Sequence, residues 1–201
     1  MKHKVALFGA ACAAMAMGSA AGIALLQDNG DVALAFGIKQ IASARGPEDA
    51  LPADLASNLE AGGWSVIPTS SRLLRADGPG KYYTFTGGPP GRTDDLCFLA
   101  REQVVVAGAA RTRTRMGCSA KDVLESDGAL GLLGDEADGS WTYVGLVPDG
   151  VDRIEAGGRS VPVVGNVARL GLGRVPGSLK ATLRGAGVSR AINVVVPEPR
   201  G

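Results

Sequence analysis

From Trp64 onward, hydrophobic residues fall in short stretches that glycine and proline separate. Stretches of this kind, rich in β-branched and aromatic residues and bounded by turn residues, are typical of β-strands. Turn signals such as Asp77-Gly78-Pro79-Gly80 and Gly157-Gly158 recur between them. We therefore expect strands at 64–67, 81–86, 96–100, 103–107, 141–147, 151–155, 160–164, 179–184 and 191–196.

Two of these stretches, 141–147 and 151–155, flank the sequence Pro148-Asp149-Gly150. Proline presets φ for the first turn position, aspartate tolerates the second, and glycine takes a positive φ. The pattern predicts a β-hairpin. Asp149 at its tip is either a carboxylate offered to a ligand or, more simply, a residue suited to the turn.

Before Trp64 the hydrophobic pattern has a helical period instead. Residues 28–45 carry a broad apolar face, and a second helix is expected at 52–60, where leucines recur every fourth residue. The chain is thus predicted to be mainly β, a sandwich or barrel of short antiparallel strands over 64–201. A short helical region over 27–63 precedes it.

The first 26 residues have the pattern of an export segment. Residues 2–4 are basic, and Val5–Leu26 contains no charged residue. Ser19 and Ala21 suit the −3 and −1 positions of a signal peptide that is cleaved after Ala21. An uncleaved membrane anchor is the alternative, because an apolar run of this length can cross about 30 Å of hydrocarbon. Either way, this segment contacts the membrane during export, and we expect an extracellular or cell-envelope location.

Cysteine usage agrees with export. Of three cysteines, Cys12 lies in the export segment, which leaves the pair Cys97 and Cys118 for an oxidising compartment. Neither has the C-x-x-C spacing of a redox couple or a metal-binding pair. We therefore predict a structural disulfide between Cys97 and Cys118.

Composition excludes several classes of function. The net charge of the 201-residue chain is +1, which gives no reason to expect a nucleic-acid partner. The single histidine, His3, lies in the export segment, so its removal leaves no imidazole base or metal ligand. Neither a phosphate-binding P-loop nor a serine-hydrolase elbow is present. We expect no cofactor, no metal and no catalysis. The alternative is an extracellular enzyme using a carboxylate pair, with Asp94-Asp95 or Asp149 and Asp152 as the clusters near strand ends.

The most unusual local pattern is Arg111-Thr112-Arg113-Thr114-Arg115. In an extended strand, Arg111, Arg113 and Arg115 share one face. They are candidate anion-binding residues for acidic polymers or lipid headgroups. The alternatives are charges that keep an edge strand from aggregating, or cations neutralised within the chain by the acidic segment 122–138. Part of that segment, 135–139, is similar to a calcium loop but lacks its full register, so we expect a solvated loop.

One segment resembles known sequences. Gly145-Leu146-Val147-Pro148-Asp149-Gly150-Val151, with Cys97 and Cys118 upstream and Gly165-Asn166-Val167 downstream, resembles uncharacterised exported proteins of high-GC bacteria. The resemblance covers roughly residues 95–170; it implies an exported domain and supplies no catalytic residues. We therefore expect an exported, disulfide-stapled, non-catalytic binding or envelope-structural domain whose ligand the sequence does not name.

Overall fold

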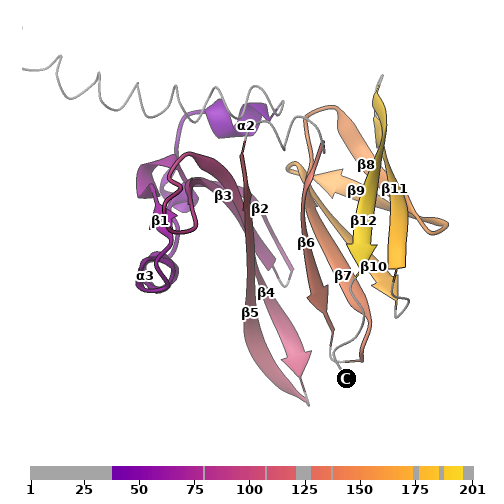
Figure 1. Cartoon of the computed structure of the whole chain (residues 1–201), viewed down its shortest axis with the longest axis horizontal. Coiled ribbons are helices and arrows are strands. Elements are labelled where there is room, and N and C mark those ends of the chain that lie inside the picture. The colour runs from indigo at the N-terminus through magenta and orange to yellow at the C-terminus, as the bar shows by residue number, and fades with distance from the viewer. Residues whose placement is uncertain are drawn as a thin grey trace, which may run out of the picture.

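The computed structural model describes residues 38–78, 80–106, 108–120, 128–136, 138–173, 177–185 and 188–196. These residues form two curled antiparallel sheets, with short helices at one side of the first sheet (Figure 1). The helical elements are α2 (Lys39–Ala42), η1 (Pro47–Asp49), α3 (Ala53–Ala61) and η2 (Pro68–Ser70). The predicted export segment 1–26 lies outside the described residues.

The first sheet is built around two long strands. Its order is β1-β3-β4-β5, and β2 pairs with the same strand β3 as β1 does, along a different stretch. The strands are β1 (Ser65–Val66), β2 (Arg72–Asp77), β3 (Gly80–Gly88), β4 (Asp95–Val106) and β5 (Ala109–Ser119). The pairing of β3 with β4 ends at Gly80 opposite Glu102, so the β4–β5 hairpin continues past β3.

The first part of strand β4, residues 95–100, is buried on both faces because the first sheet lies between the helical elements and the second sheet. Leu96, Phe98 and Ala100 pack in a cluster with residues of the second sheet. Cys97 and Leu99 point the opposite way and pack in a cluster with leucines of α3 and the segment before it. This two-sided burial explains why β4 begins as an uninterrupted apolar run and not as an alternating one.

The second sheet has seven strands in the order β12-β11-β8-β9-β10-β7-β6. Strand β9 pairs with β8 through its first four residues and with β10 through its last two, so it joins the two halves of the curled sheet. The strands are β6 (Leu130–Asp135), β7 (Trp141–Leu146), β8 (Val151–Ala156), β9 (Arg159–Val164), β10 (Val167–Gly173), β11 (Gly177–Gly185) and β12 (Val188–Val196).

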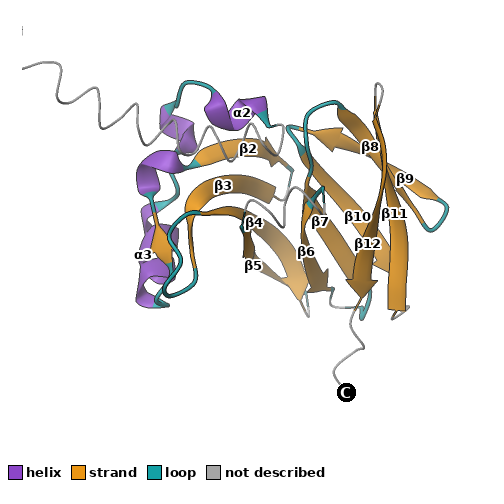
Figure 2. Cartoon of the chain, turned by 45° about the horizontal axis from the view of Figure 1, so that its top comes forward, coloured by secondary structure: helices purple, strands orange, loops and turns teal. Residues whose placement is uncertain are grey.

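The cluster that contains Leu96 and one further hydrophobic cluster hold the layers together. One lies between the sheets and receives Ile38 and Ile41, which are 0% and 1% exposed, from the start of the described chain. The other lies within the curl of the second sheet, where Ile154, Leu170 and Leu183 are buried. Figure 2 shows the resulting order of layers, from α3 through the first sheet to the two halves of the second.

The prediction of a mainly β chain is confirmed. The expected strands correspond to β1, β3, β4, β7, β8, β9, β11 and β12, with 96–100 and 103–107 merged into β4. The helix expected at 52–60 is α3, which begins at Ala53 after Pro52. Of the helix expected over 28–45, only residues 38–45 are described, and there the helix is the single turn α2. No helix in the described ranges is both long and apolar enough to span a bilayer.

The predicted hairpin of 141–147 with 151–155 is wrong, although its turn is present. The amide of Val151 donates to the carbonyl of Pro148, and Gly150 has φ of 81°. However, β7 pairs with β6 and β10, whereas β8 pairs with β9 and β11. The turn therefore carries the chain from one half of the curled sheet to the other. Which strands β7 and β8 pair with depends on residues far away in the sequence, so the turn residues alone do not predict it.

Candidate functional site

The three arginines of the RTRTR sequence lie on one face of β5, as predicted, and that face looks toward the second sheet. Their exposure increases along the strand away from the core. The Arg115 side chain is 9% exposed, the Arg113 side chain is 20% exposed, and Arg111 is exposed to solvent. The stripe therefore begins inside the protein and ends in solvent.

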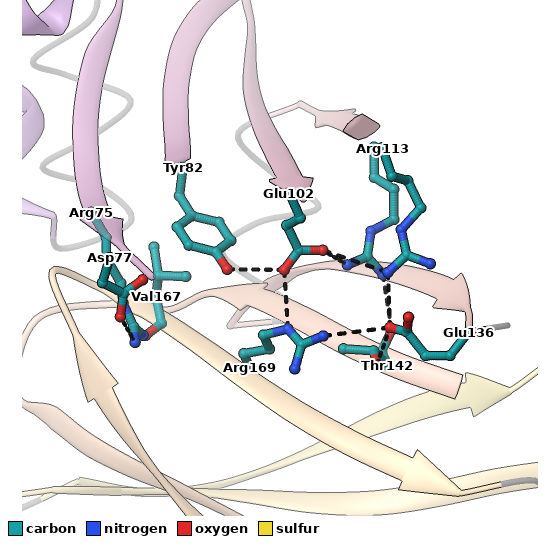
Figure 3. A network of polar contacts seen from close by, with 10 residues as sticks. Arg75, Asp77, Tyr82, Glu102, Arg113, Glu136, Thr142, Val167 and Arg169 are labelled. Atoms are coloured by element: carbon teal, nitrogen blue, oxygen red, sulfur yellow. Dashed lines mark hydrogen bonds and ion pairs between the residues drawn. The ribbon is translucent and has the colours of Figure 1, made fainter. Parts of the chain in front are cut away.

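The inner end of the stripe binds a buried carboxylate. Glu102, which is 2% exposed, lies directly opposite Arg113 in the β4–β5 register. Its carboxylate forms ion pairs with Arg115, with Arg113 at 3.7 Å and with Arg169 Nε at 3.0 Å, and it accepts a hydrogen bond of 2.9 Å from the Tyr82 hydroxyl (Figure 3). Side chains from β3, β4 and β5 of the first sheet and from β10 of the second thus meet at one carboxylate.

A second carboxylate completes the cluster from the second sheet. Glu136, just after β6, accepts hydrogen bonds from Arg113 at 2.8 Å and from the Thr142 hydroxyl at 2.6 Å. It also lies 3.5 Å from Arg169. We call Tyr82, Glu102, Arg113, Arg115, Glu136, Thr142 and Arg169 the intersheet cluster.

Arg115 contacts the backbone of β7 in the second sheet because the neighbouring strand β6 has a glycine, Gly134, next to its guanidinium. Its Nη1 donates to the carbonyl of Thr142 on β7 at 3.2 Å. A Cβ atom built on Gly134 of β6 would overlap the Arg115 guanidinium. The absence of a side chain at residue 134 is therefore what admits the arginine.

The electrostatics of the cluster keep both glutamates ionised. Burial alone would raise the pKa of Glu102, but Arg115, the Tyr82 hydroxyl and Arg169 outweigh it, and the pKa is lowered. For Glu136, burial is likewise outweighed, here by Arg113 and Thr142, and the pKa is lowered. Burial and Glu102 together raise the pKa of the Tyr82 hydroxyl, so it stays a donor. Such a cluster joins the two sheets through ion pairs, because every charged side chain in it lies next to a side chain of opposite charge.

A network of the same kind joins β2 to β10. Arg75 forms an ion pair with Asp77, donates to the carbonyl of Val167 at 3.3 Å, and has its guanidinium carbon 5.9 Å from the centre of the Tyr82 ring. Gly165 allows a close approach here as well, since a Cβ atom on it would overlap the carbonyl of Leu74. Polar contacts therefore join the second sheet to three strands of the first, to β2 here and to β4 and β5 through the intersheet cluster.

The predicted cysteine pair lies together in the structure. Cys97 and Cys118 are directly opposite in the β4–β5 register, and their sulfur atoms are 1.96 Å apart, at bonding distance. The bond lies on the α3 side of the first sheet, among the apolar side chains of that cluster. It closes the base of the hairpin whose other end carries the exposed arginine.

Of the acidic residues considered for catalysis, Asp95, Asp149 and Asp152 form hydrogen bonds or ion pairs within the chain. Asp95 is 2% exposed and accepts hydrogen bonds from Arg92. Asp149 binds the backbone amide of Lys39 at 2.8 Å and the Asn166 amide group at 2.9 Å, while Asp152 pairs with its neighbour Arg153. Asp138, from the calcium-like sequence, accepts hydrogen bonds from Ser140. In the described ranges, no three of the residue types that bind metals are grouped together.

The outer end of the hairpin has the opposite character to its base. We call residues 103–106 and 108–112 the hairpin end. Val105 is 66% exposed and Val106 38%, and both Ala109 and Ala110 are in the exposed class. Gln103 and Thr112, which face each other, share a side-chain hydrogen bond of 2.9 Å. No third strand of the described chain pairs with this part of the hairpin.

The sequence pattern indicates the arginines and, through the acidic segment 122–138, one partner, Glu136, which pairs with Arg113. It does not indicate the other partners. Tyr82, Glu102 and Arg169 come from three strands, and no local spacing links them. The one available signal was Glu102 itself, a charged residue within a run that otherwise predicts a buried strand. Comparison with protein-family models, with curated proteins and with solved structures finds no match to this chain.

Proposed function

We propose that this chain is an exported, disulfide-stapled, non-catalytic domain that binds a component of the cell envelope through its hairpin end. The supporting observation is the contrast along one hairpin. At its base, the charges of Arg113 and Arg115 are satisfied within the protein, whereas at its end two valines and Arg111 face solvent. Exposed apolar residues gathered at a projecting element are typical of an interaction site.

The export part of the proposal rests on residues 1–26 and on the cysteine pair. A charge-free run after a basic start is typical of a signal peptide or anchor. A cysteine pair held at bonding distance across two strands suits an oxidising compartment. The glutamates of the intersheet cluster have lowered pKa values, whereas a general acid needs a carboxyl that keeps its proton near neutral pH.

Counting free thiols tests export and processing together. The full chain is expressed in bacteria and its thiols are labelled with a bulky maleimide after denaturation without reductant. A cleaved, oxidised chain adds no label, and an anchored, oxidised chain adds one, at Cys12. The control lacks residues 2–26, stays in the cytoplasm, and adds two labels. A full chain that fractionates with the cytoplasm and labels at all three cysteines contradicts the proposal.

Envelope binding is tested by sedimentation of the exported chain with isolated envelopes. Replacing Val105 and Val106 by serine is expected to lower the bound fraction. The matched control is Val164→Ser, which changes another exposed valine, 49% exposed, on β9. Equal loss in both variants would contradict a role for the hairpin end.

A further inference from the structure

We infer that the hairpin end docks on an anionic lipid bilayer, with its valines at the headgroup boundary and Arg111 on the headgroups. This inference rests on the proposed export and names the envelope component that the hairpin binds. It is carried by an apolar tip, residues 104–106 and 108–110, that lies beside one exposed cation, Arg111, together with the sequence that precedes the described residues.

The tip of the hairpin end, residues 104–106 and 108–110, has apolar side chains on both of its faces. Val104 and Val106 lie on the face that carries Arg111, and Val105 and Ala110 lie on the other, since cross-strand partners share a face. An isolated two-stranded ribbon has little stability in water. Exposed valines at the end of such a ribbon gain from transfer to an apolar boundary, as shallow interfacial elements do.

Charge at the tip has one sign. Residues 103–112 contain one cation, Arg111, and no acidic residue, although the whole chain contains 20. The described part of the structure gives Arg111 no ion-pair partner, and its side chain follows directly after the apolar tip. A long arginine beside apolar residues can place its guanidinium among phosphates while the tip meets the acyl boundary.

The preceding chain can reach the same bilayer. The charge-free segment Val5–Leu26 is followed by eleven residues, 27–37, before the described structure begins at Ile38. The α2 end and the hairpin end lie at opposite ends of the molecule in both views (Figures 1 and 2). An extended chain of eleven residues spans up to roughly 40 Å, and the twelve residues of β4 span about the same length. An anchored segment therefore leaves the tip free to turn to the membrane.

The test uses the full chain reconstituted in vesicles of phosphatidylcholine with about a third phosphatidylglycerol. Val105→Trp reports on the tip, and Val164→Trp is the matched control at the other exposed valine. Difference spectra against the parent chain remove Trp64 and Trp141. We expect a shift of emission to shorter wavelength and quenching by brominated lipid at residue 105 and not at residue 164.

Arg111→Gln in the Val105→Trp chain tests the charge contribution. A basic residue near an anionic surface contributes about 1 kcal/mol, so the inserted-to-free ratio is expected to fall about fivefold. Vesicles of phosphatidylcholine alone should give the same low ratio for both chains. No quenching at residue 105 in anionic vesicles overturns the inference, and so does equal quenching in neutral ones.

Other occupants of the tip give distinct results. A shift in emission at residue 105 that grows with protein concentration without vesicles, with a matching dimer mass, assigns the tip to a second copy and overturns the lipid assignment. An exported, oxidised chain that loses envelope binding when Val105 and Val106 are replaced, but whose residue 105 is never quenched, overturns the lipid assignment and leaves the proposed function standing with another envelope component. A reduced cytoplasmic chain refutes the proposed function itself.

Discussion

Glu102 on β4 and Arg169 on β10 meet between the two sheets, with 3.0 Å between the arginine Nε and the glutamate carboxylate. They are 67 residues apart in the sequence. Glu102 also binds Arg113 and Arg115 of the neighbouring strand β5. One buried carboxylate therefore fixes both the pairing of β4 with β5 and the position of the second sheet over the first.

Replacing Glu102 by glutamine should destabilise the fold strongly. The change leaves the Arg115 guanidinium, which is 9% exposed, without its carboxylate, whereas Arg113 and Arg169 keep Glu136. We expect a loss of about 3 kcal/mol in the free energy of unfolding. Urea denaturation with the cysteine pair intact measures it. Glu155→Gln is the control, since Glu155 also pairs with two arginines but lies on the surface, and its midpoint should be unchanged. Equal effects of the two changes would mean that the intersheet cluster contributes no more than a surface pair.

Stability should also depend on pH through the same carboxylates. The pKa values of Glu102 and Glu136 are lowered in the folded state from the ordinary value of 4.5. The folded protein then binds fewer protons than the unfolded chain, so these groups stabilise it fully above pH 4.5 and lose that contribution as pH falls through their folded pKa values. When urea denaturation is measured at decreasing pH from pH 7, the urea concentration at the midpoint should begin to decrease once the pH is below about 4.5. The fall should be smaller in Glu102→Gln, and an identical pH profile would contradict the assignment.

The cysteine pair makes a separate contribution. Cys97 and Cys118 are 21 residues apart, and a bond that closes a loop of this size stabilises by about 3 kcal/mol. Replacing both by alanine should lower the free energy of unfolding by that order and abolish any effect of reductant. The parent chain measured with and without reductant is the control. A parent chain whose midpoint does not respond to reductant would show that the bond adds no stability.

The strands could be predicted from the sequence where burial is one-sided or continuous, but not where polar or small residues have distant partners. The sequence pattern does not predict β2, β6 and β10, and it indicates part of β5 through the arginines of RTRTR. Glycines weaken the strand pattern of β6, although Gly134 lies in the strand and leaves the space that the Arg115 guanidinium occupies. Arg101 and Glu102 split the predicted β4 in two, and each has a partner far along the chain, Asp54 and Arg169. Long-range partners of this kind leave no local period to detect.

Asn166 should prove important for the connection that carries the chain between the halves of the second sheet. It has φ of 60°, and its amide group donates to the carbonyl of Val147 at 3.1 Å and to Asp149 at 2.9 Å. Asn166→Ala loses both hydrogen bonds and strains the backbone, at a cost of about 2 kcal/mol. Asn166→Gly removes only the bonds, at about 1 kcal/mol. Denaturation of both variants separates the two effects, and equal midpoints would show that backbone strain at residue 166 does not contribute to the loss of stability.

Gly145 should be intolerant of a side chain although its backbone is that of an ordinary strand. It faces Gly131 across the β6–β7 pairing, and the ring of Tyr143 lies over it. A Cβ atom there would be 2.5 Å from Cε1 of that ring, and Tyr143 is only 4% exposed, so the ring has no free space into which to move. Gly145→Ala should therefore cost about 1–3 kcal/mol by overpacking. Gly171→Ala on β10 is the matched control, because its nearest neighbour would be Arg159 Nη1 at 3.8 Å. There alanine should be neutral or slightly stabilising, since it restricts the unfolded chain. A tolerated Gly145→Ala with unchanged near-ultraviolet circular dichroism would show that the Tyr143 ring is not fixed against the glycine pair.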